Sequence, residues 1–218
     1  MAVGLLVGAW TAICIAAGVG GVLYGAGLLL VPLAVTGGIH LDGFCDVVDA
    51  QASNAPSERK REILKDPHTG AFAAIGVAAY FVAYAAIGSE VPPCWQVAVL
   101  VGGMHVASRC LSGIATVVYP TSAGRGMLSM FHESGKGMLV PAVLAVEFVA
   151  AGAAMVWACA PVAAAMLLVG LACAVLLLPF ANRQFGGMSG DLAGFFLQVA
   201  EIAMLATLMV AAKVVGLP

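Results

Sequence analysis

Charged side chains are scarce in this chain. Only 9% of its 218 residues are Asp, Glu, Lys or Arg, whereas 62% are hydrophobic, and the mean hydropathy is +1.06. A water-soluble globule needs more polar side chains than this to cover its surface. The composition therefore excludes a soluble domain and predicts a polytopic protein of the lipid bilayer.

Basic residues are absent before Arg59, and paired cysteine motifs are absent throughout. The opening apolar run therefore lacks the positively charged start of a cleaved signal peptide, which predicts a retained span. None of the six cysteines forms a CxxC pair, and most lie inside apolar runs, as small buried hydrophobes do. The chain also has no Walker loop, no dinucleotide fingerprint and no basic aromatic-rich patch, so we expect no nucleic-acid partner.

Apolar runs of membrane-spanning length cover most of the chain. Residues 2–38 are too long for one span and about right for two spans joined by a tight turn. Single spans are predicted for the later runs at 71–88, 95–119, 138–157, 162–181 and 191–211. The predicted fold of residues 1–218 is a single all-α domain, a polytopic integral membrane bundle of about seven transmembrane helices.

Three hydrophilic connections separate these runs, at 39–70, 120–137 and 182–190. An even number of predicted crossings lies between them, so all three face the same side of the membrane. They contain most of the basic residues, namely Arg59, Lys60, Arg61, Lys65, Arg125, Lys136 and Arg183. The positive-inside rule makes that side cytoplasmic. We therefore expect a multi-pass membrane protein whose site faces the cytoplasm.

Three aspartates stand together in the first connection. Asp42, Asp46 and Asp49 are spaced i, i+4, i+7, which on a helix places them within an arc of roughly 60°. Like charges on one face repel each other, and a bound cation would neutralise that repulsion. Hard carboxylate oxygens suit Mg²⁺ or Mn²⁺ holding a phosphorylated substrate. The row predicts a metal site in this Asp-rich cytoplasmic segment.

The first connection continues into a charged stretch that ends at Pro67. A solvated amphipathic turn of helix explains residues 58–62 as well as a functional role does. Lys65, Asp66 and His68 lie where the next span begins, within reach of a phosphate or of the metal. We therefore include these three among the candidate site residues.

A second polar face runs along the predicted span 95–119, where His105, Arg109, Ser112 and Thr116 are spaced i, i+4, i+7, i+11. Arg109 lies near mid-span, where a charge costs at least ~2.5 kcal/mol, so it must face the bundle interior or a water-filled cavity. Two interpretations are open. Arg109 contacts a substrate phosphate, or it is the buried partner of an acidic residue, Glu147 or Glu201.

The last connection leads into the final span through Asp191. Asp191 is either a cap at the start of a helix or a site residue. Glu201 lies about 15 Å further along the helix axis, near the bilayer centre, where a carboxylate is a functional-site hypothesis by default. Glu147 qualifies on the same ground, although it has no polar neighbour at helical spacing.

Taken in order, these motifs resemble cobalamin synthase, the adenosylcobinamide-GDP ribazoletransferase family. The matching strings are GGIHLDG from Gly37 with Asp46 and Asp49, KDPHTGAF from Lys65, Ser108-Arg109, and GGMSGD from Gly186 with Glu201. The resemblance covers nearly the whole chain, and HLDGxxDxxD is its specific part. It implies an Mg²⁺-dependent enzyme of adenosylcobalamin biosynthesis in a bacterial or archaeal cytoplasmic membrane. Such an enzyme transfers the adenosylcobinamide phosphoryl moiety from adenosylcobinamide-GDP to α-ribazole or α-ribazole 5′-phosphate, and releases GMP.

The resemblance also implies roles for individual residues. The catalytic residues would be His40, Asp42, Asp46, Asp49, Lys65 and Asp66. The metal ligands would be Asp42, Asp46, Asp49, Asp66 and Asp191. Substrate contacts would come from Lys65, His68, Arg109, Asp191 and Glu201. The partners implied are the two substrates and the lipid bilayer, while a homo-oligomer or association with other membrane-bound enzymes of cobalamin assembly stays open.

The chain departs from the family pattern in having few residues before its first span and in having His68 where arginine is frequent. Two other interpretations remain. A CDP-alcohol phosphotransferase also uses aspartates on helices, but its DGxxAR pattern is absent, since Phe44-Cys45-Asp46 follows Asp42-Gly43. A cation-coupled transporter would explain acidic and basic residues inside the membrane. It would not explain the aspartate row at the membrane surface.

Overall fold

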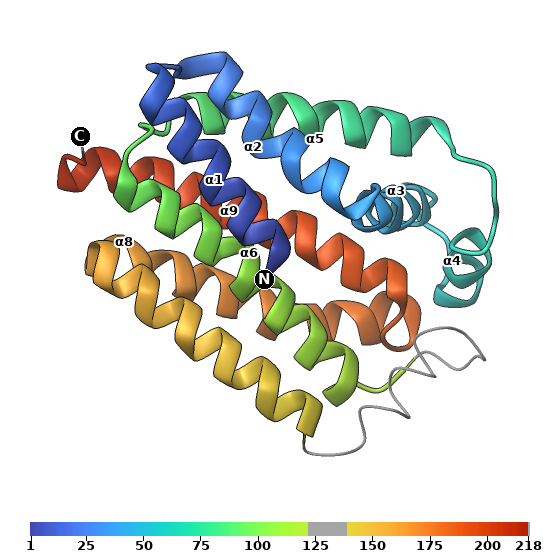
Figure 1. Cartoon of the computed structure of the whole chain (residues 1–218). Coiled ribbons are helices and arrows are strands. Elements are labelled where there is room, and N and C mark those ends of the chain that lie inside the picture. The colour runs from blue at the N-terminus through green and yellow to red at the C-terminus, as the bar shows by residue number, and fades with distance from the viewer. Residues whose placement is uncertain (122–138, 218) are drawn as a thin grey trace.

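The computed structural model describes residues 1–121 and 139–217, and these are almost entirely helical (Figure 1). The β-type contact in the described ranges is one isolated bridge between Thr121 and Met188. The predicted connection at 120–137 lies, apart from its start, outside the described residues. In chain order the helices are α1 (Ala2–Ala17), α2 (Gly21–Thr36), α3 (Ile39–Ala52), α4 (Ser57–Ile63), α5 (Ala71–Ser89), α6 (Trp95–Val118), α8 (Leu139–Phe185) and α9 (Gly190–Val215).

Within the described residues, four helices are long and apolar enough to cross a membrane, namely α5, α6, α8 and α9. A fifth crossing is counted if α2 and α3 act as one bent span, and α1 is a shorter apolar helix. α8 contains two of the predicted spans, because its 47 residues break at Cys159, where φ is −163° and ψ is 96°. The prediction of an all-α membrane bundle is confirmed, and each of the seven predicted spans corresponds to a helical segment.

α3 lies across one end of the bundle, at 100° to α2 (Figure 1). The change of direction occurs at Gly37 and Gly38, whose φ angles of +62° and +79° are accessible to glycine at little cost. With 14 residues and three aspartates, α3 is too short and too polar to span a bilayer by itself. The aspartate row is therefore held outside the long spans, where the chain meets water.

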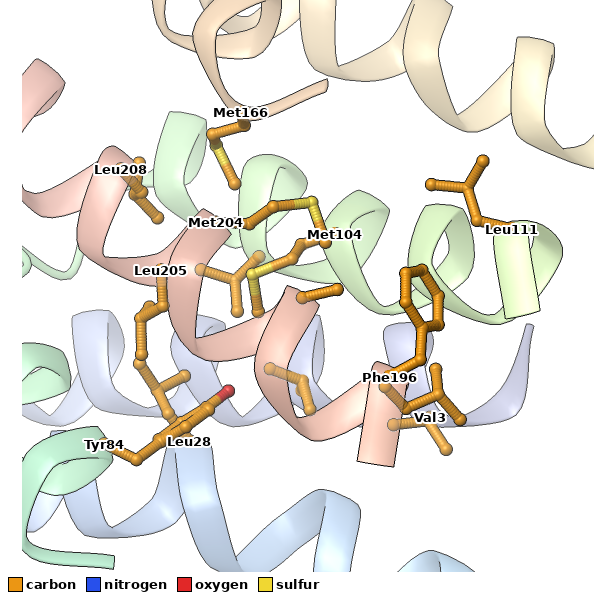
Figure 2. Close-up of a cluster of buried hydrophobic side chains, with 14 of the residues drawn as sticks. Val3, Leu28, Tyr84, Met104, Leu111, Met166, Phe196, Met204, Leu205 and Leu208 are labelled. Carbon is orange, nitrogen blue, oxygen red and sulfur yellow. The ribbon is translucent and has the colours of Figure 1, made fainter. Parts of the chain in front are cut away.

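The core is built from apolar side chains of α1, α2, α3, α5, α6, α8 and α9, which pack against one another across these helices (Figure 2). Large apolar side chains, such as Trp157 and Val214, also cover the outside of the bundle. An apolar outer surface of this extent fits contact with lipid. The buried residues labelled in Figure 2 are Val3, Leu28, Tyr84, Met104, Leu111, Met166, Phe196, Met204, Leu205 and Leu208.

Candidate active site

α3 packs against the start of α9, and two glycines permit the close approach. A Cβ atom on Gly43 would lie 2.8 Å from the Asp191 Cα, and one on Gly194 would lie 2.8 Å from the His40 carbonyl oxygen. The N-cap of α9 is Ser189, whose Oγ accepts the Leu192 backbone N–H at 3.2 Å. Asp191 is therefore not the N-cap, and it lies beside the aspartate row of α3.

The carboxylates of this acidic cluster (Asp42, Asp46, Asp49 and Asp191) affect one another. The pKa of Asp46 is raised to about 6, first by partial burial and then by the negative charges of Asp191, Asp42 and Asp49. A carboxylate whose neighbours oppose its ionisation gains most from a cation placed between them. The donor chemistry, carboxylate oxygens from two helices, therefore fits a hard divalent ion.

The side chains of the acidic cluster do not converge on one point. Within residues 1–121 and 139–217, no three His, Cys, Asp or Glu side chains form a group arranged to hold a metal ion. Asp42 is exposed, whereas Asp46, Asp49 and Asp191 are partly buried. The metal role of these residues stays a prediction.

Asp49 has a structural contact that the sequence did not indicate. Its two carboxylate oxygens accept the backbone N–H groups of Gly70, at 2.5 Å, and Ala73, at 2.8 Å. These N–H groups belong to the start of α5, which has no side-chain cap of its own. Asp49 therefore fastens α3 to α5, in addition to any role in the acidic cluster.

Lys65, Asp66 and His68 lie exposed in the connection between α4 and α5. The Asp66 Oδ1 atom accepts the His68 backbone N–H at 3.0 Å and lies 2.7 Å from His68 Nδ1. This backbone hydrogen bond, followed by the side-chain contact, lowers the pKa of Asp66. Within the described residues, the hydrogen bonds of the Asp66 side chain are thus made with His68, and none links it to the aspartates of α3.

A charged network lies deeper, between α6 and α9. Glu201, only 3% exposed, accepts hydrogen bonds at Oε1 from Arg109 Nη1 at 2.6 Å and from Ser108 Oγ at 2.8 Å. His105 Nδ1 lies 3.1 Å from the same oxygen. Glu147 instead accepts a weak contact from Cys110 Sγ at 3.9 Å. Of the partners considered for Arg109, the structure therefore selects Glu201.

A small cavity connects this network with the start of α3. It has a volume of about 20 Å³, and its polar lining includes His40, Gln198, Arg109 and Glu201. Tyr84 also lines it, and the buried Tyr84 hydroxyl has no hydrogen-bond partner in the described structure. The volume admits about one water molecule. Arg109, whose side chain is 21% exposed, lies where this cavity meets the charged network.

Comparison with known protein families gives a match that covers almost the whole chain. The family model of cobalamin-5-phosphate synthase matches residues 1–209. The chain belongs to the cobalamin-5-phosphate synthase family. The resemblance inferred from the motifs is thereby confirmed, and every candidate residue from His40 to Glu201 lies inside the matched range.

Curated relatives of this cobalamin-5-phosphate synthase family member are called adenosylcobinamide-GDP ribazoletransferase. The relative from Lachnoclostridium phytofermentans is 34% identical over 183 residues, covering 84% of this chain and 69% of the relative. One from Geobacillus thermodenitrificans is 31% identical over 185 residues, 80% of this chain and 67% of the relative. One from Synechococcus elongatus is 30% identical over 176 residues, 80% of this chain and 68% of the relative. No solved structure matches the chain.

Sequence reasoning missed Lys60, which it placed on a solvated helix. Lys60 is only 5% exposed and donates hydrogen bonds to the side chains of Gln51 and Gln184. One signal was present in the sequence, because Lys60 precedes Leu64 by one helical turn and so shares its apolar face. That face packs against α3 and α8 instead of meeting solvent.

Proposed function

We propose that this chain transfers the adenosylcobinamide phosphoryl moiety from adenosylcobinamide-GDP to α-ribazole or its 5′-phosphate and releases GMP. The observation that carries the proposal is the family match over residues 1–209. The shared name of the relatives supplies the donor and the ribazole acceptor. The acidic cluster at the end of the bundle supports phosphoryl chemistry at that place.

In this reaction a hydroxyl oxygen of the ribazole forms a bond to the phosphorus that carries the cobinamide. The bond from that phosphorus to GMP breaks, GMP leaves with the bonding electrons, and the hydroxyl proton passes to a base. Positioning and charge neutralisation account for most of the rate of such transfers. The protein must therefore hold a polyanion beside its own carboxylates.

Asp42, Asp46 and Asp191 would hold Mg²⁺, with Mn²⁺ as a substitute, and Asp49 and Asp66 remain candidates for further ligands. The ion, when bound, neutralises the pyrophosphate and the departing GMP. The raised pKa of Asp46 supports this assignment, because partial burial and the negative charges of Asp191, Asp42 and Asp49 all oppose its ionisation, and a bound cation would offset them. We expect the carboxylates to turn toward one another when the ion binds.

His40 is the base that we assign to the acceptor hydroxyl. Burial lowers the pKa of His40, and the nearby charge of Arg109 lowers it further, which favours the neutral ring that can accept a proton. It lies in the first turn of α3, against the backbone of Gly194. The exposed Lys65 and His68 are assigned to substrate phosphates, since both lie on the same side of the membrane as α3.

We also propose that this end of the bundle faces the cytoplasm. α3, α4 and the turn between α8 and α9 lie at the same end (Figure 1), and Arg59, Lys60, Arg61 and Arg183 belong to these segments. The pair of Glu90 and Lys213 lies at the other end. Single cysteines at Ser53 and Asn182 should resist impermeant thiol reagents in intact cells, whereas one at Glu90 should react. Labelling of the cysteines at positions 53 and 182 from outside intact cells would contradict the proposed orientation.

The activity is tested with the purified protein in lipid nanodiscs. Adenosylcobinamide-GDP and α-ribazole 5′-phosphate are supplied with Mg²⁺ or with EDTA, and GMP and the corrinoid product are separated by chromatography. We expect equimolar GMP and joined product with Mg²⁺ and neither with EDTA. Asp46→Asn should abolish both, while Cys45→Ala on the same helix should retain them. GMP release without a joined product would refute the proposed acceptor.

The transporter and CDP-alcohol phosphotransferase interpretations receive less support. The buried carboxylate that suggested ion coupling, Glu201, is neutralised by Arg109. The family match covers almost the whole chain, and the curated relatives are called adenosylcobinamide-GDP ribazoletransferase, not CDP-alcohol phosphotransferase.

A further inference from the structure

Lys60 joins three helices, of which α8 is distant in sequence from the other two. Its Nζ atom donates hydrogen bonds to Gln51 Oε1 on α3, at 2.8 Å, and to Gln184 Oε1 at the end of α8, at 2.5 Å. Lys60 itself belongs to α4. In the described part of the chain, the Lys60 ammonium group thus links α4 to polar side chains of both α3 and α8.

This ammonium group is buried without a counter-charge. Its neighbours on α4 form ion pairs, Arg59 with Glu62 and Arg61 with Glu58, but within the described residues no carboxylate pairs with Lys60. Burial of a charge against neutral amide oxygens is unfavourable compared with an apolar side chain of the same length. Packing alone would therefore favour methionine at this position.

The Gln51 side chain shows how the contact between Lys60 and α3 is oriented. We call the contacts of Lys60 with Gln51 and Gln184 the Lys60 joint. The Gln51 Oε1 atom faces Lys60, and the Gln51 Nε2 atom is buried without a hydrogen-bond partner. An amide that leaves its N–H groups unsatisfied is held in place by the bond that its oxygen makes. Within residues 1–121 and 139–217, the hydrogen bond from Lys60 is therefore the polar contact that orients the Gln51 side chain at the end of α3.

The two glutamines flank the acidic cluster. Gln51 follows Asp46 and Asp49 on α3, and Gln184 precedes the turn that leads to Asp191. We propose that Lys60 is a positioning residue, which sets the separation between the aspartates of α3 and the start of α9. The inference rests on the proposed function in one respect, that these two segments together hold the cation and the pyrophosphate.

The separation can be measured directly by pulsed electron paramagnetic resonance. Spin labels are placed at Ser53, just after α3, and at Asn182, near the end of α8, both exposed positions, in a full-length variant without the native cysteines. Lys60→Met should broaden or shift the distance distribution. Arg59→Met, which removes a neighbouring exposed positive charge, should leave it unchanged. An unchanged distribution in Lys60→Met would overturn the proposal whether or not the protein is a transferase.

Binding of Mn²⁺ in the absence of substrates gives the second readout. We expect Lys60→Met to weaken Mn²⁺ binding by about tenfold or more, with helical content retained and with the Arg59→Met control unaffected. Gln51→Leu should weaken binding in the same direction, and the double variant Lys60→Met with Gln51→Leu should be no worse than Lys60→Met alone, because the two act through one contact.

The outcomes separate the two proposals. A shifted distance with weaker Mn²⁺ binding supports Lys60 as a positioning residue of the cation site. A shifted distance with unchanged Mn²⁺ binding shows a purely structural joint and overturns the positioning role. If the wild-type protein neither binds Mn²⁺ nor performs the transfer, the proposed function fails together with the role assigned to Lys60, whereas the distance measurement still reports the joint.

Discussion

Arg109 and Glu201 form a buried ion pair between α6 and α9, with 2.6 Å from Nη1 to Oε1. His105 and Ser108 contact the same carboxylate oxygen, so that two adjacent turns of α6 converge on one residue of α9. The pair lines the small cavity that reaches His40. The ion pair therefore links α6 to α9, and it lies next to the candidate active site.

This pair predicts strong non-additivity. Arg109→Gln should leave the Glu201 carboxylate buried without its cation and lower the free energy of unfolding by about 3–5 kcal/mol. Combining it with Glu201→Gln should restore most of that loss, as measured by thermal or denaturant unfolding in detergent. Transfer activity of the double variant tests the substrate role. Restored stability without activity would support a substrate contact by Arg109, and full activity would reject it.

Asp46 and Asp49 should respond differently to substitution. Asp46→Asn should lower turnover by orders of magnitude with little change in thermal stability, because it removes a charged ligand and keeps the shape. Asp49→Ala should lower the free energy of unfolding by about 1 kcal/mol, since the first N–H groups of α5 lose their acceptor. Asp49→Asn, which retains one acceptor oxygen, should recover part of this loss. Equal stability of all three variants would contradict the capping role.

The pKa of Asp46 predicts how stability depends on pH. Because the folded-state pKa of about 6 lies above the ordinary value of 3.8, the native state binds more protons than the unfolded state between these values. Without divalent ions, stability should therefore fall as pH rises from about 4 to about 6. Asp46→Asn should reduce this slope, and so should saturating Mg²⁺, while Asp191 contributes to it because burial and the charge of Asp42 raise its pKa too. The measurement is the unfolding temperature in EDTA across that range, and a slope unchanged in Asp46→Asn would contradict the assignment.

The close approach of α3 to α9 should depend on Gly43. In Gly43→Ala the new Cβ would lie 2.8 Å from backbone atoms of Asp191, so one helix must move. We expect a loss of about 1–3 kcal/mol in stability, as for other overpacked contacts, together with reduced transfer activity. Gly190→Ala is the matched control, because no atom lies within 4 Å of the added Cβ. Equal effects of the two substitutions would show that the helices are free to separate.

The membrane fold and the row of aspartates could be predicted from the sequence. Hydropathy is a local property, and a bilayer requires every spanning backbone to satisfy its own hydrogen bonds, so apolar runs of the right length become helices. The i, i+4, i+7 spacing likewise needs only helical geometry to bring Asp42, Asp46 and Asp49 onto one face.

The tertiary structure decided what each charged residue contacts. The sequence left Arg109 with two acidic partners, and packing of α6 on α9 selected Glu201. Asp49 became the acceptor for the start of α5, and Lys60 turned inward to Gln51 and Gln184. These contacts depend on how separate helices pack against one another, and those of Arg109 with Glu201 and of Lys60 with Gln184 join helices that are distant in the chain. Spacing along one helix specifies which side chains share a face, but only the packing of that face against its neighbours determines which charge meets which partner.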